Sequence, residues 1–437
     1  KLLKLSPLAS DALPHELRIH DIESLSEYIP RLESAGYLRE TKALLQSLPE
    51  LDALYRNTRE PISRADEYIS KATAERIFGK TLRLSQTSAE LYAKCPMSFQ
   101  CKYALKLSED AASEPSSADI GTLVHSVLRS FLDEGLGSNE TLEVKINELV
   151  KRDCTLILEF TPEEKRPRIA HLLERVSNTT ALAAANLMRE FESSDFKPTF
   201  FELPVGISDD GILPIRLMLE DGSSVVLRGI ADRVDTMLRG DKLYFRVADY
   251  KTGNREFSLD AIRLGLNMQL LIYLFSIWEN ADSAFMKACG AEGAQPIPAG
   301  AEYVMTSLEK KKFADTTDPE KIAEALGGSF GRSGIYLSDP EVLAAMDREQ
   351  NGKFIPIKNL TKAQAGGVLA DLAEFESLKR ELSGILIEIG NGIKSGCAKI
   401  DPLPASKFLR AGACGYCPMK PVCKNAVDHT EDEAADE

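Results

Sequence analysis

The sequence of 437 residues lacks the features that define several common classes of protein. It has no run of about 18 or more apolar residues, so no membrane-spanning helix is expected, and no secretory signal opens it. Eight cysteines are too few for a disulfide framework in a chain of this length, which favours a reduced cytoplasm. An excess of basic residues is also missing, because the net charge is −14. This charge argues against nucleic-acid binding over the whole surface.

Charge is unevenly distributed along the chain. Residues 428–437 hold six carboxylates and no lysine or arginine, a composition typical of a disordered, solvated tail. Conversely, seven basic residues surround four of the cysteines: Lys94, Lys102, Lys106, Lys407, Arg410, Lys420 and Lys424. If those cysteines meet in space, a basic patch forms on an acidic protein. Contact with DNA depends on such a patch rather than on the total charge.

The four cysteines lie at the two ends of one long span. Cys414, Cys417 and Cys423 follow the spacing C-x2-C-x5-C, which is one ligand short of a four-thiolate site. Cys95 lies 319 residues before Cys414 and is the expected fourth ligand. Four thiolates bind either zinc or an iron–sulfur cluster. Zinc ribbons usually offer two close pairs, so one distant ligand plus three favours the cluster.

Cys101 is the rival fourth ligand. It follows Cys95 by six residues, about 240° around a regular helix, so the two are not expected to face one site. The remaining cysteines, Cys154, Cys289 and Cys397, have no ligand-like spacing and are expected to be buried apolar residues.

A hairpin is predicted around Gly240-Asp241, between strands expected at 224–236 and 242–250. A two-residue turn there pairs residues whose numbers add to 481, which puts Asp232 opposite Asp249, with Cβ atoms roughly 4.5–5.5 Å apart. Lys251 lies two residues further and shares their face. Two carboxylates on an otherwise apolar face cost several kcal/mol unless a cation compensates, and a divalent metal does so. The alternative is that both are solvated residues at strand ends.

Three other side chains are candidates for the same site. His125 lies at the edge of the apolar stripe of a helix expected to begin near residue 120, and Gln269 and Tyr273 are one helical turn apart. Each has an ordinary structural interpretation. A histidine at such an edge is more often a core residue satisfied by a hydrogen bond, and Tyr273 is equally consistent with packing.

The periodicity of the remaining chain predicts a mixture of helices and strands. Helices are expected over 22–32, 37–45, 65–77, 88–94, 142–159, 162–192 (bent at Pro167), 259–278 and 361–393. Further strands are expected over 199–205, 212–219 and 302–306. We find no internal repeat. The chain begins at Lys1 without a methionine, so we expect it to be part of a longer protein.

These pieces, in this order, resemble the RecB-type branch of the PD-(D/E)XK nucleases. The resemblance rests on G-x-x-x-H ending at His125, G-I-A-D ending at Asp232, Asp249-Tyr250-Lys251, and Q-x-x-x-Y beginning at Gln269. With Cys95 and C-x2-C-x5-C added, residues 84–426 resemble the C-terminal part of the AddB family, the second subunits of bacterial helicase–nucleases. No single piece is specific, but the combination is. Ala231 departs from the bulky aliphatic residue that is more usual before the aspartate.

The resemblance implies an α/β fold with a mixed central β-sheet of the restriction-endonuclease-like type. Helices would flank the sheet, with large helical insertions and an iron–sulfur staple. Three segments follow: residues 1–83 as the helical remainder of an upstream helicase-like region, 84–426 as the nuclease domain, and 427–437 as a disordered acidic tail.

The resemblance also implies roles for the site residues. His125, Asp232, Asp249 and the backbone carbonyl of Tyr250 would hold Mg²⁺ or Mn²⁺, and Lys251 would orient the attacking water. Gln269 would contact DNA or support the metal ligands, and Tyr273 would stack on or bond to the substrate backbone. The 4Fe–4S ligands would be Cys95, Cys414, Cys417 and Cys423, in a structural role.

The resemblance implies two partners: an AddA-like helicase–nuclease protein, which would form a heterodimer with this chain, and a single DNA strand from an unwound duplex. The complex would act in double-strand break processing and recombinational repair. Two alternatives stay open. One is a stand-alone exonuclease of the CRISPR-associated iron–sulfur type, and the other is a non-catalytic module that clamps DNA.

Overall fold

The computed structural model describes residues 2–4, 16–18, 68–108, 115–138, 140–159, 161–208, 211–307, 330–349, 352–357, 363–364 and 367–423. The chain divides into two compact units, Lys1–Asp66 and Glu67–Glu437. In the first, strands β1 (Leu2–Lys4) and β2 (Glu16–Arg18) pair antiparallel. The helices expected over 22–32 and 37–45, and the acidic tail, lie outside the described residues. The division expected at residue 83 stays a prediction.

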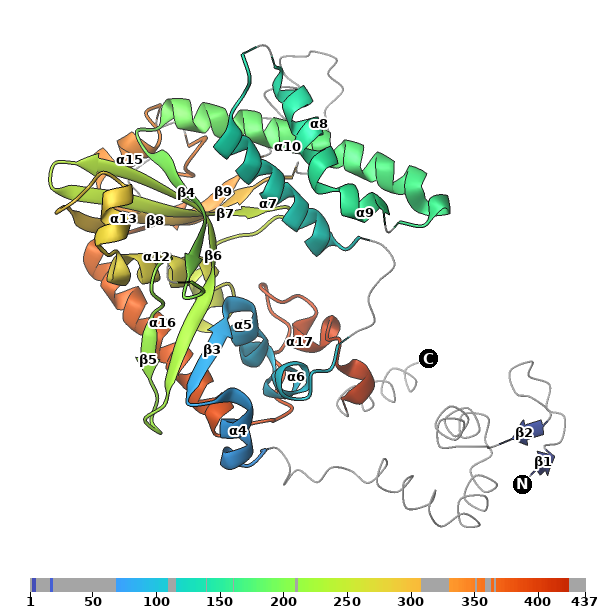
Figure 1. Ribbon diagram of the computed structural model, residues 1–437. Helices are drawn as coiled ribbons and strands as arrows, with labels where there is room; N and C mark the ends of the chain where they lie inside the picture. Colours follow the sequence, from blue (N-terminus) through green and yellow to red (C-terminus); the bar gives the residue numbers. More distant parts are fainter. Residues whose placement is uncertain are drawn as a thin grey trace. The chain divides into compact units, whose positions relative to one another are not determined.

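The second unit is built on a nine-stranded mixed sheet, which confirms the predicted fold class (Figure 1). The strand order is β10-β11-β9-β8-β7-β6-β3, and β4 and β5 also pair with β6. The strands are β3 (Thr81–Ser85), β4 (Lys197–Val205), β5 (Arg216–Met218), β6 (Ser224–Arg239), β7 (Lys242–Lys251), β8 (Gln295–Met305), β9 (Arg332–Leu337), β10 (Ala363–Gln364) and β11 (Gly367–Ala370). β6 and β7 are antiparallel, whereas β7 and β8 are parallel.

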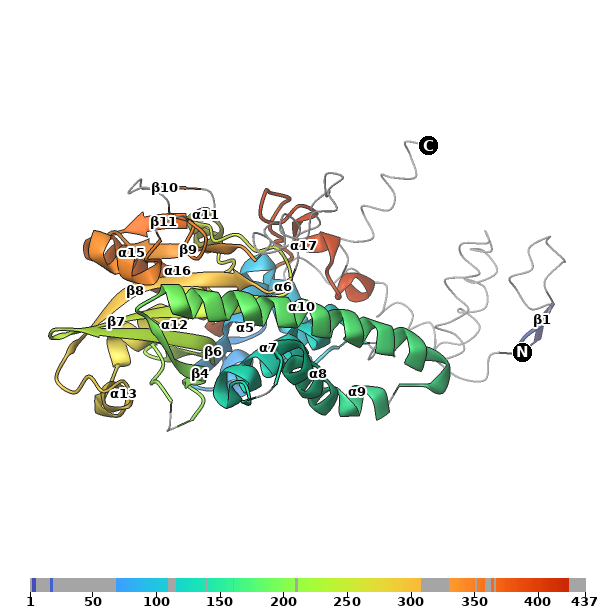
Figure 2. The same cartoon turned by 90° about the horizontal axis from the view of Figure 1, so that it is seen from above.

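Helices cover both faces of this sheet (Figures 1 and 2). The helices are α4 (Lys71–Phe78), α5 (Gln86–Lys94), α6 (Pro96–Phe99), η2 (Gln100–Ala104), α7 (Ser117–Glu134), α8 (Leu142–Asp153), α9 (Thr155–Glu159), η3 (Glu163–Lys165), α10 (Arg166–Ser193), α11 (Leu259–Arg263), α12 (Gln269–Asn280), α13 (Ser283–Ala288), α15 (Pro340–Met346), α16 (Leu372–Lys394), α17 (Gly412–Gly415) and η4 (Lys420–Val422). Among the described residues, none of them is both long and apolar enough to span a membrane.

Two apolar cores hold the layers together. The larger one joins the sheet to α12 and α16 and includes Val234, Phe245 and Val247. The second joins the other face to α7, α8 and α10 and takes in Ala248 and Tyr250. Because side chains alternate along a strand, neighbouring residues of β7 face different cores. β7 is buried along nearly its whole length, as expected for a central strand covered on both faces.

Several predicted helices differ from the structure. The helix expected over 259–278 is two helices, α11 and α12, because Gly265 (φ +73°) and Asn267 (φ +55°) adopt left-handed backbone between them. The helix expected over 162–192 is not bent at Pro167. Instead α10 begins at Arg166 and the proline occupies its first turn, where its missing N–H costs nothing.

Two further corrections concern helix ends. The stretch 142–159 is broken after α8, so that α9 is a separate short helix. The helix expected from residue 361 begins at Leu372, where Asp371 and Glu374 form a reciprocal capping box, and strand β11 precedes it.

Candidate active site and cysteine region

The β6–β7 hairpin has the predicted register. Its pairs run from Arg239↔Lys242 to Arg233↔Ala248, and every pair adds to 481. Gly240 begins the turn with φ +62°, a conformation that glycine adopts without strain. The same register carried one step further places Asp232 across from Asp249, where the ladder ends.

Asp232 is held by contacts from two neighbouring elements, α7 and β7. Its Oδ2 lies 3.3 Å from Nδ1 of His125, which α7 supplies, and accepts a hydrogen bond of 2.8 Å from the backbone N–H of Tyr250 on β7. The His125 ring also meets the Tyr250 ring edge-on, with centroids 5.8 Å apart. Burial opposes protonation of His125, but the hydrogen bond and charge of Asp232 outweigh it, so the pKa of His125 is raised.

Asp249 is the least satisfied group in the site. It is 1% exposed; its Oδ2 contacts Nζ of Lys251, while Oδ1 has no hydrogen-bond partner in the described part of the chain. Burial, and then the charge of Asp232, raise the pKa of Asp249 to about 6. A buried carboxylate oxygen without a partner, beside a second carboxylate and an imidazole, is the donor set that a hard divalent cation accepts.

The candidate ligands lie on neighbouring elements but are not arranged around a metal. Within the described residues, no three His, Cys, Asp or Glu side chains stand close enough together to coordinate an ion as they are. Instead Lys251 neutralises Asp249, and Nζ of Lys251 also donates to Oε1 of Gln269 at 3.3 Å. The site thus holds its own cation beside its buried carboxylate.

Tyr273 occupies a supporting position. It is 4% exposed, and its hydroxyl accepts a hydrogen bond of 3.2 Å from the backbone N–H of Ile230. A Cβ added at Gly229 would lie 2.2 Å from that hydroxyl, which explains why glycine begins G-I-A-D. Burial raises the pKa of Tyr273 to about 12, so it stays neutral. These contacts favour support of the ligand strand over stacking on substrate, and the role stays a prediction.

Sequence reasoning missed a second set of charges on the other face of the same hairpin. Arg233, Asp235 and Arg246 are each 0% exposed. We call this cluster the arginine face; it comprises Arg233, Arg246, Arg332, Glu190, Asp235 and Glu302. Three arginines therefore meet three carboxylates, and the six residues come from α10 and four strands. A signal was present in Asp232-Arg233-Val234-Asp235, because alternation puts Arg233 and Asp235 on the face opposite Asp232.

Individual contacts in the arginine face are short. Arg332 Nη2 lies 2.6 Å from Oε2 of Glu190, and Arg246 Nε lies 2.8 Å from Oδ2 of Asp235. The cluster also reaches the active site, since Nη1 of Arg233 donates to the Tyr250 hydroxyl at 3.0 Å. Tyr250 thus contacts the arginine face through its side chain and Asp232 through its backbone.

The two ends of the cysteine span meet in the structure. The backbone N–H of Leu403 donates to the carbonyl of Lys94 at 2.9 Å, and Ser98 Oγ lies 3.8 Å from Sγ of Cys417. α17 accordingly lies beside α6 in both ribbon views (Figures 1 and 2). Burial raises the pKa of the Cys95 thiol, backbone hydrogen bonds partly offset this, and the charge of Cys423 adds to it.

The angular argument against Cys101 as a ligand does not hold, because residues 95–104 do not form one regular helix. Burial raises the pKa of the Cys101 thiol, and the charges of Cys423, Cys417 and Cys95 raise it further. The angle of about 240° assumed a regular helix. The chain instead runs from an extended Cys95 through the short α6 into the π-helix η2. Cys101 therefore stays a rival ligand.

The eight cysteines are all free thiols. Cys154 is 1% exposed, as predicted for an apolar residue, whereas Cys289 and Cys397 are partly buried against the larger core. The segments that carry Cys95 and Cys417 are in contact, but no three cysteines of the described residues stand at positions that could hold a metal.

A family model and curated relatives match most of this chain. The family model described as the PD-(D/E)XK nuclease superfamily matches residues 83–424. The chain is similar to the B subunit of an ATP-dependent helicase/deoxyribonuclease from Clostridium acetobutylicum, 29% identical over 82% of this chain and 31% of the relative. A protein of the same description from Desulforudis audaxviator is 29% identical over 86% of this chain and 32% of the relative. The chain thus spans about a third of the length of these relatives.

Proposed function

The chain belongs to the PD-(D/E)XK nuclease superfamily, and on that premise we propose that it hydrolyses phosphodiester bonds in one strand of DNA with Mg²⁺, or Mn²⁺, as its metal. The observation that carries the proposal is Asp249, a buried carboxylate with one unpartnered oxygen, opposite Asp232 and beside Lys251. Bound metal would lower the pKa of a water molecule and shield the charge of the phosphate.

His125, Asp232, Asp249 and the carbonyl of Tyr250 are the proposed metal ligands. Their support comes from the hairpin register and from the contact of Asp232 with His125. A bound metal ion would supply Lewis-acid chemistry at Asp249, which Lys251 contacts in this structure. The Lys251 ammonium would orient the attacking water and stabilise the negative charge that develops on the phosphorus-bound oxygens. Gln269 holds Lys251 through its side-chain oxygen, and Tyr273 fixes β6 at Ile230.

The cysteine region is proposed to bind a 4Fe–4S cluster through Cys95, Cys414, Cys417 and Cys423. The cluster would have a structural role, because it would close a loop of more than three hundred residues. The contacts between residues 94–98 and 403–417 support this assignment. Cys101 is the alternative to Cys95.

We propose that the chain works as part of the second subunit of a cytoplasmic helicase–nuclease that processes double-strand breaks for recombinational repair. The supporting observation is the similarity to proteins described as B subunits of helicase/deoxyribonucleases. An AddA-like protein would be the partner and would supply the strand. A DNA-clamping module without catalysis is the second candidate, and it would bind DNA without cutting it.

One experiment tests the site. The chain is incubated with labelled single-stranded DNA and Mg²⁺, beside Asp249→Ala. Cleavage by the wild type that is absent from the variant is the expected result. DNA binding without cleavage by either protein would favour the clamp, and equal cleavage by both would refute the site.

A second experiment tests the cluster. Cys95→Ala and Cys101→Ala are prepared without oxygen and assayed for iron and for absorbance near about 400 nm, where iron–thiolate centres absorb. We expect Cys95→Ala to lose iron and melt at a lower temperature, and Cys101→Ala to keep both properties. The opposite pattern would make Cys101 the fourth ligand. Zinc in place of iron in the wild type would refute the cluster.

A further inference from the structure

A cavity of about 220 Å³ opens beside the proposed active site. Lys251 and Gln269 line one side of it, and α5 and η2 supply Lys94 and Lys102 on another. The cavity therefore joins the residues around Asp249 to the segment that carries Cys95 and Cys101. If a substrate strand lay across Asp249, its neighbouring nucleotides would reach this cavity.

The lining of the cavity is positively charged. Four cations, Lys94, Lys102, Lys251 and Arg255, face a single carboxylate, Glu90, although the chain as a whole carries a net charge of −14. Such a local excess of cations on an acidic protein attracts an anion, and the backbone phosphates of nucleic acids are anions.

Glu90 already contacts other residues that line the cavity. Its Oε1 lies 2.7 Å from Nζ of Lys94, and its Oε2 accepts a hydrogen bond of 3.1 Å from the backbone N–H of Asn267. These contacts fix Lys94 and tie α5 to the left-handed turn before α12. Lys102 and Arg255 are exposed, and neither is paired with a carboxylate in the described part of the chain. They are the cations available to an incoming phosphate.

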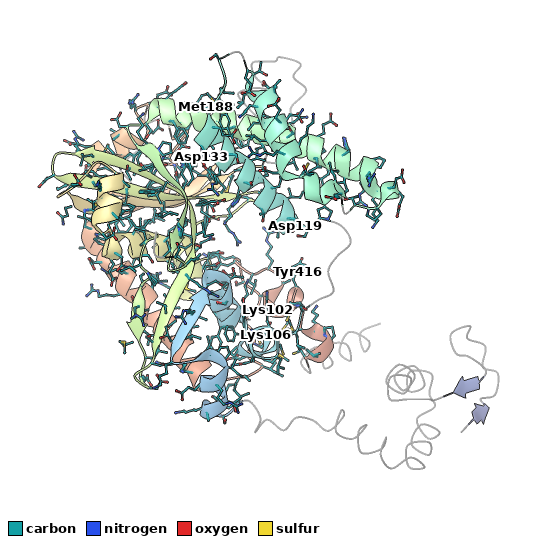
Figure 3. All side chains as sticks on the ribbon, viewed as in Figure 1. Lys102, Lys106, Asp119, Asp133, Met188 and Tyr416 are labelled. Atoms are coloured by element: carbon teal, nitrogen blue, oxygen red, sulfur yellow. The ribbon has the colours of Figure 1, made fainter. Side chains whose placement is uncertain are left out.

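An exposed aromatic ring continues this surface. Tyr416, between Cys414 and Cys417, is 92% exposed, far more than any other large apolar side chain in the described residues. Ser98, four residues before Lys102, has its Oγ 3.8 Å from Sγ of Cys417, which follows Tyr416. Figure 3 labels Lys102 and Tyr416 in the same part of the molecule, where α17 meets the α6–η2 segment. An aromatic ring beside a cationic groove is the arrangement that binds unpaired bases.

We propose that this surface is a binding track for single-stranded DNA. Lys102 and Arg255 hold a backbone phosphate next to the one that is cut, and Tyr416 stacks on a base further along the strand. The inference rests on the proposed nuclease function and adds the path of the strand and the residues that hold it. A base must be free of its complement to stack on Tyr416, so paired DNA does not fit the track.

The test measures binding of the full chain to a labelled oligothymidylate with Ca²⁺ in place of Mg²⁺, over a series of salt concentrations. The double variant Lys102→Gln/Arg255→Gln is expected to bind more weakly. Its plot of log affinity against log salt should be shallower by about 0.7 for each phosphate that the variant no longer neutralises. Lys287→Gln, on α13 and outside the cavity, is the matched control and should bind as the wild type does.

Substitutions of Tyr416 should affect DNA binding differently from substitutions of Lys102 and Arg255. Tyr416→Ala should bind about tenfold more weakly with an unchanged salt slope, because stacking is not a charge effect. Tyr416→Phe keeps the ring and should restore binding. These substitutions are on exposed side chains, and unchanged melting temperatures would confirm that each variant folds.

The outcomes separate the two proposals. Wild-type affinity and slope in the double variant, or Tyr416→Phe as weak as Tyr416→Ala, would overturn the track while cleavage by the wild type still supports the nuclease. Tight binding of duplex DNA that depends on Tyr416 would also overturn the track. A wild-type chain that neither binds nor cuts the strand would overturn the nuclease as well.

Discussion

The two faces of the β6–β7 hairpin both carry buried carboxylates, but they balance them differently. On the arginine face, three carboxylates meet three arginines. The pKa of Glu190 is lowered because the charges of Arg332, Arg246 and Arg233 outweigh its burial, whereas burial raises the pKa of Glu302, whose two oxygens contact Arg246 and the Tyr336 hydroxyl. On the active-site face, which we define by Asp232, Asp249 and Lys251, burial is not outweighed, and the pKa of Asp249 is raised to about 6. The same strands therefore hold one balanced cluster and one that is short of positive charge.

This difference separates structural charges from functional ones. A buried ion pair with all its partners present rigidifies a fold without needing a ligand, and removing one partner is costly. A buried carboxylate with an unpartnered oxygen is unfavourable by itself, and a cation that binds there recovers the cost. The count of partners around each carboxylate, rather than its burial, is what distinguishes Asp249 from Asp235.

The largest expected effect comes from one substitution made on each face. Asp249→Asn should reduce cleavage by about a thousandfold or more, because it removes a metal ligand. The same change should raise the metal-free free energy of unfolding at pH 8, since no charge is then buried. Asp235→Asn should instead lower the free energy of unfolding by about 3–5 kcal/mol, because Arg233 and Arg246 lose a partner.

Cleavage rates at low temperature and urea titrations measure both halves of that contrast. If Asp249→Asn were as destabilised as Asp235→Asn, Asp249 would be a structural charge. If folded Asp235→Asn were as inactive as Asp249→Asn, the two faces would not be functionally distinct.

The two faces also differ in how their contributions to stability depend on pH. Asp249 has a raised pKa in the folded chain, so its contribution to stability is fully present below its unfolded pKa and is lost as pH rises through about 6. The pKa of His125 is also raised, so its contribution to stability is likewise lost as pH rises, above the ordinary pKa of histidine. Glu190 has the opposite sign: its contribution is present above its unfolded pKa and is lost only as pH falls through its lowered folded value.

We therefore expect the metal-free wild type to lose about 2 kcal/mol relative to Asp249→Asn between pH 4 and pH 7. Urea titrations of both proteins across that range, with a chelator present, give the difference. A constant difference would mean that Asp249 titrates normally. Repeating the series with Mg²⁺ should remove most of the loss, because bound metal keeps the carboxylate ionised.

The active-site face could be predicted from the sequence because the signals for it are local. The Gly240-Asp241 turn fixed the register, and the register alone brought Asp232 opposite Asp249. The arginine face could not be assembled in this way, because Glu190 and Arg332 come from α10 and β9, far from the hairpin in sequence. The sequence shows Arg233 and Asp235 on one face of a strand. Without their partners, nothing distinguishes them from ordinary surface charges.

The position of Cys101 was hidden for a different reason. Its distance from Cys95 in sequence predicts an angle only if the helix is regular, and the π-helix η2 is not. The break between α11 and α12 depends likewise on the backbone of Asn267, which the apolar periodicity of residues 259–278 does not reveal. Both errors come from local departures of the backbone from a regular helix.

The smallest expected effect tests the one residue that touches both faces. Tyr250→Phe removes the hydroxyl that accepts from Arg233 but keeps the backbone N–H that holds Asp232. An unsatisfied buried donor costs about 1–3 kcal/mol, so the melting temperature should fall while the cleavage rate changes by less than about tenfold. Loss of cleavage as severe as in Asp249→Asn, in a variant that remains folded, would contradict this separation. The arginine face would then set the geometry of the metal ligands through Tyr250, and its balance of charge would be part of the catalytic machinery rather than only of the fold.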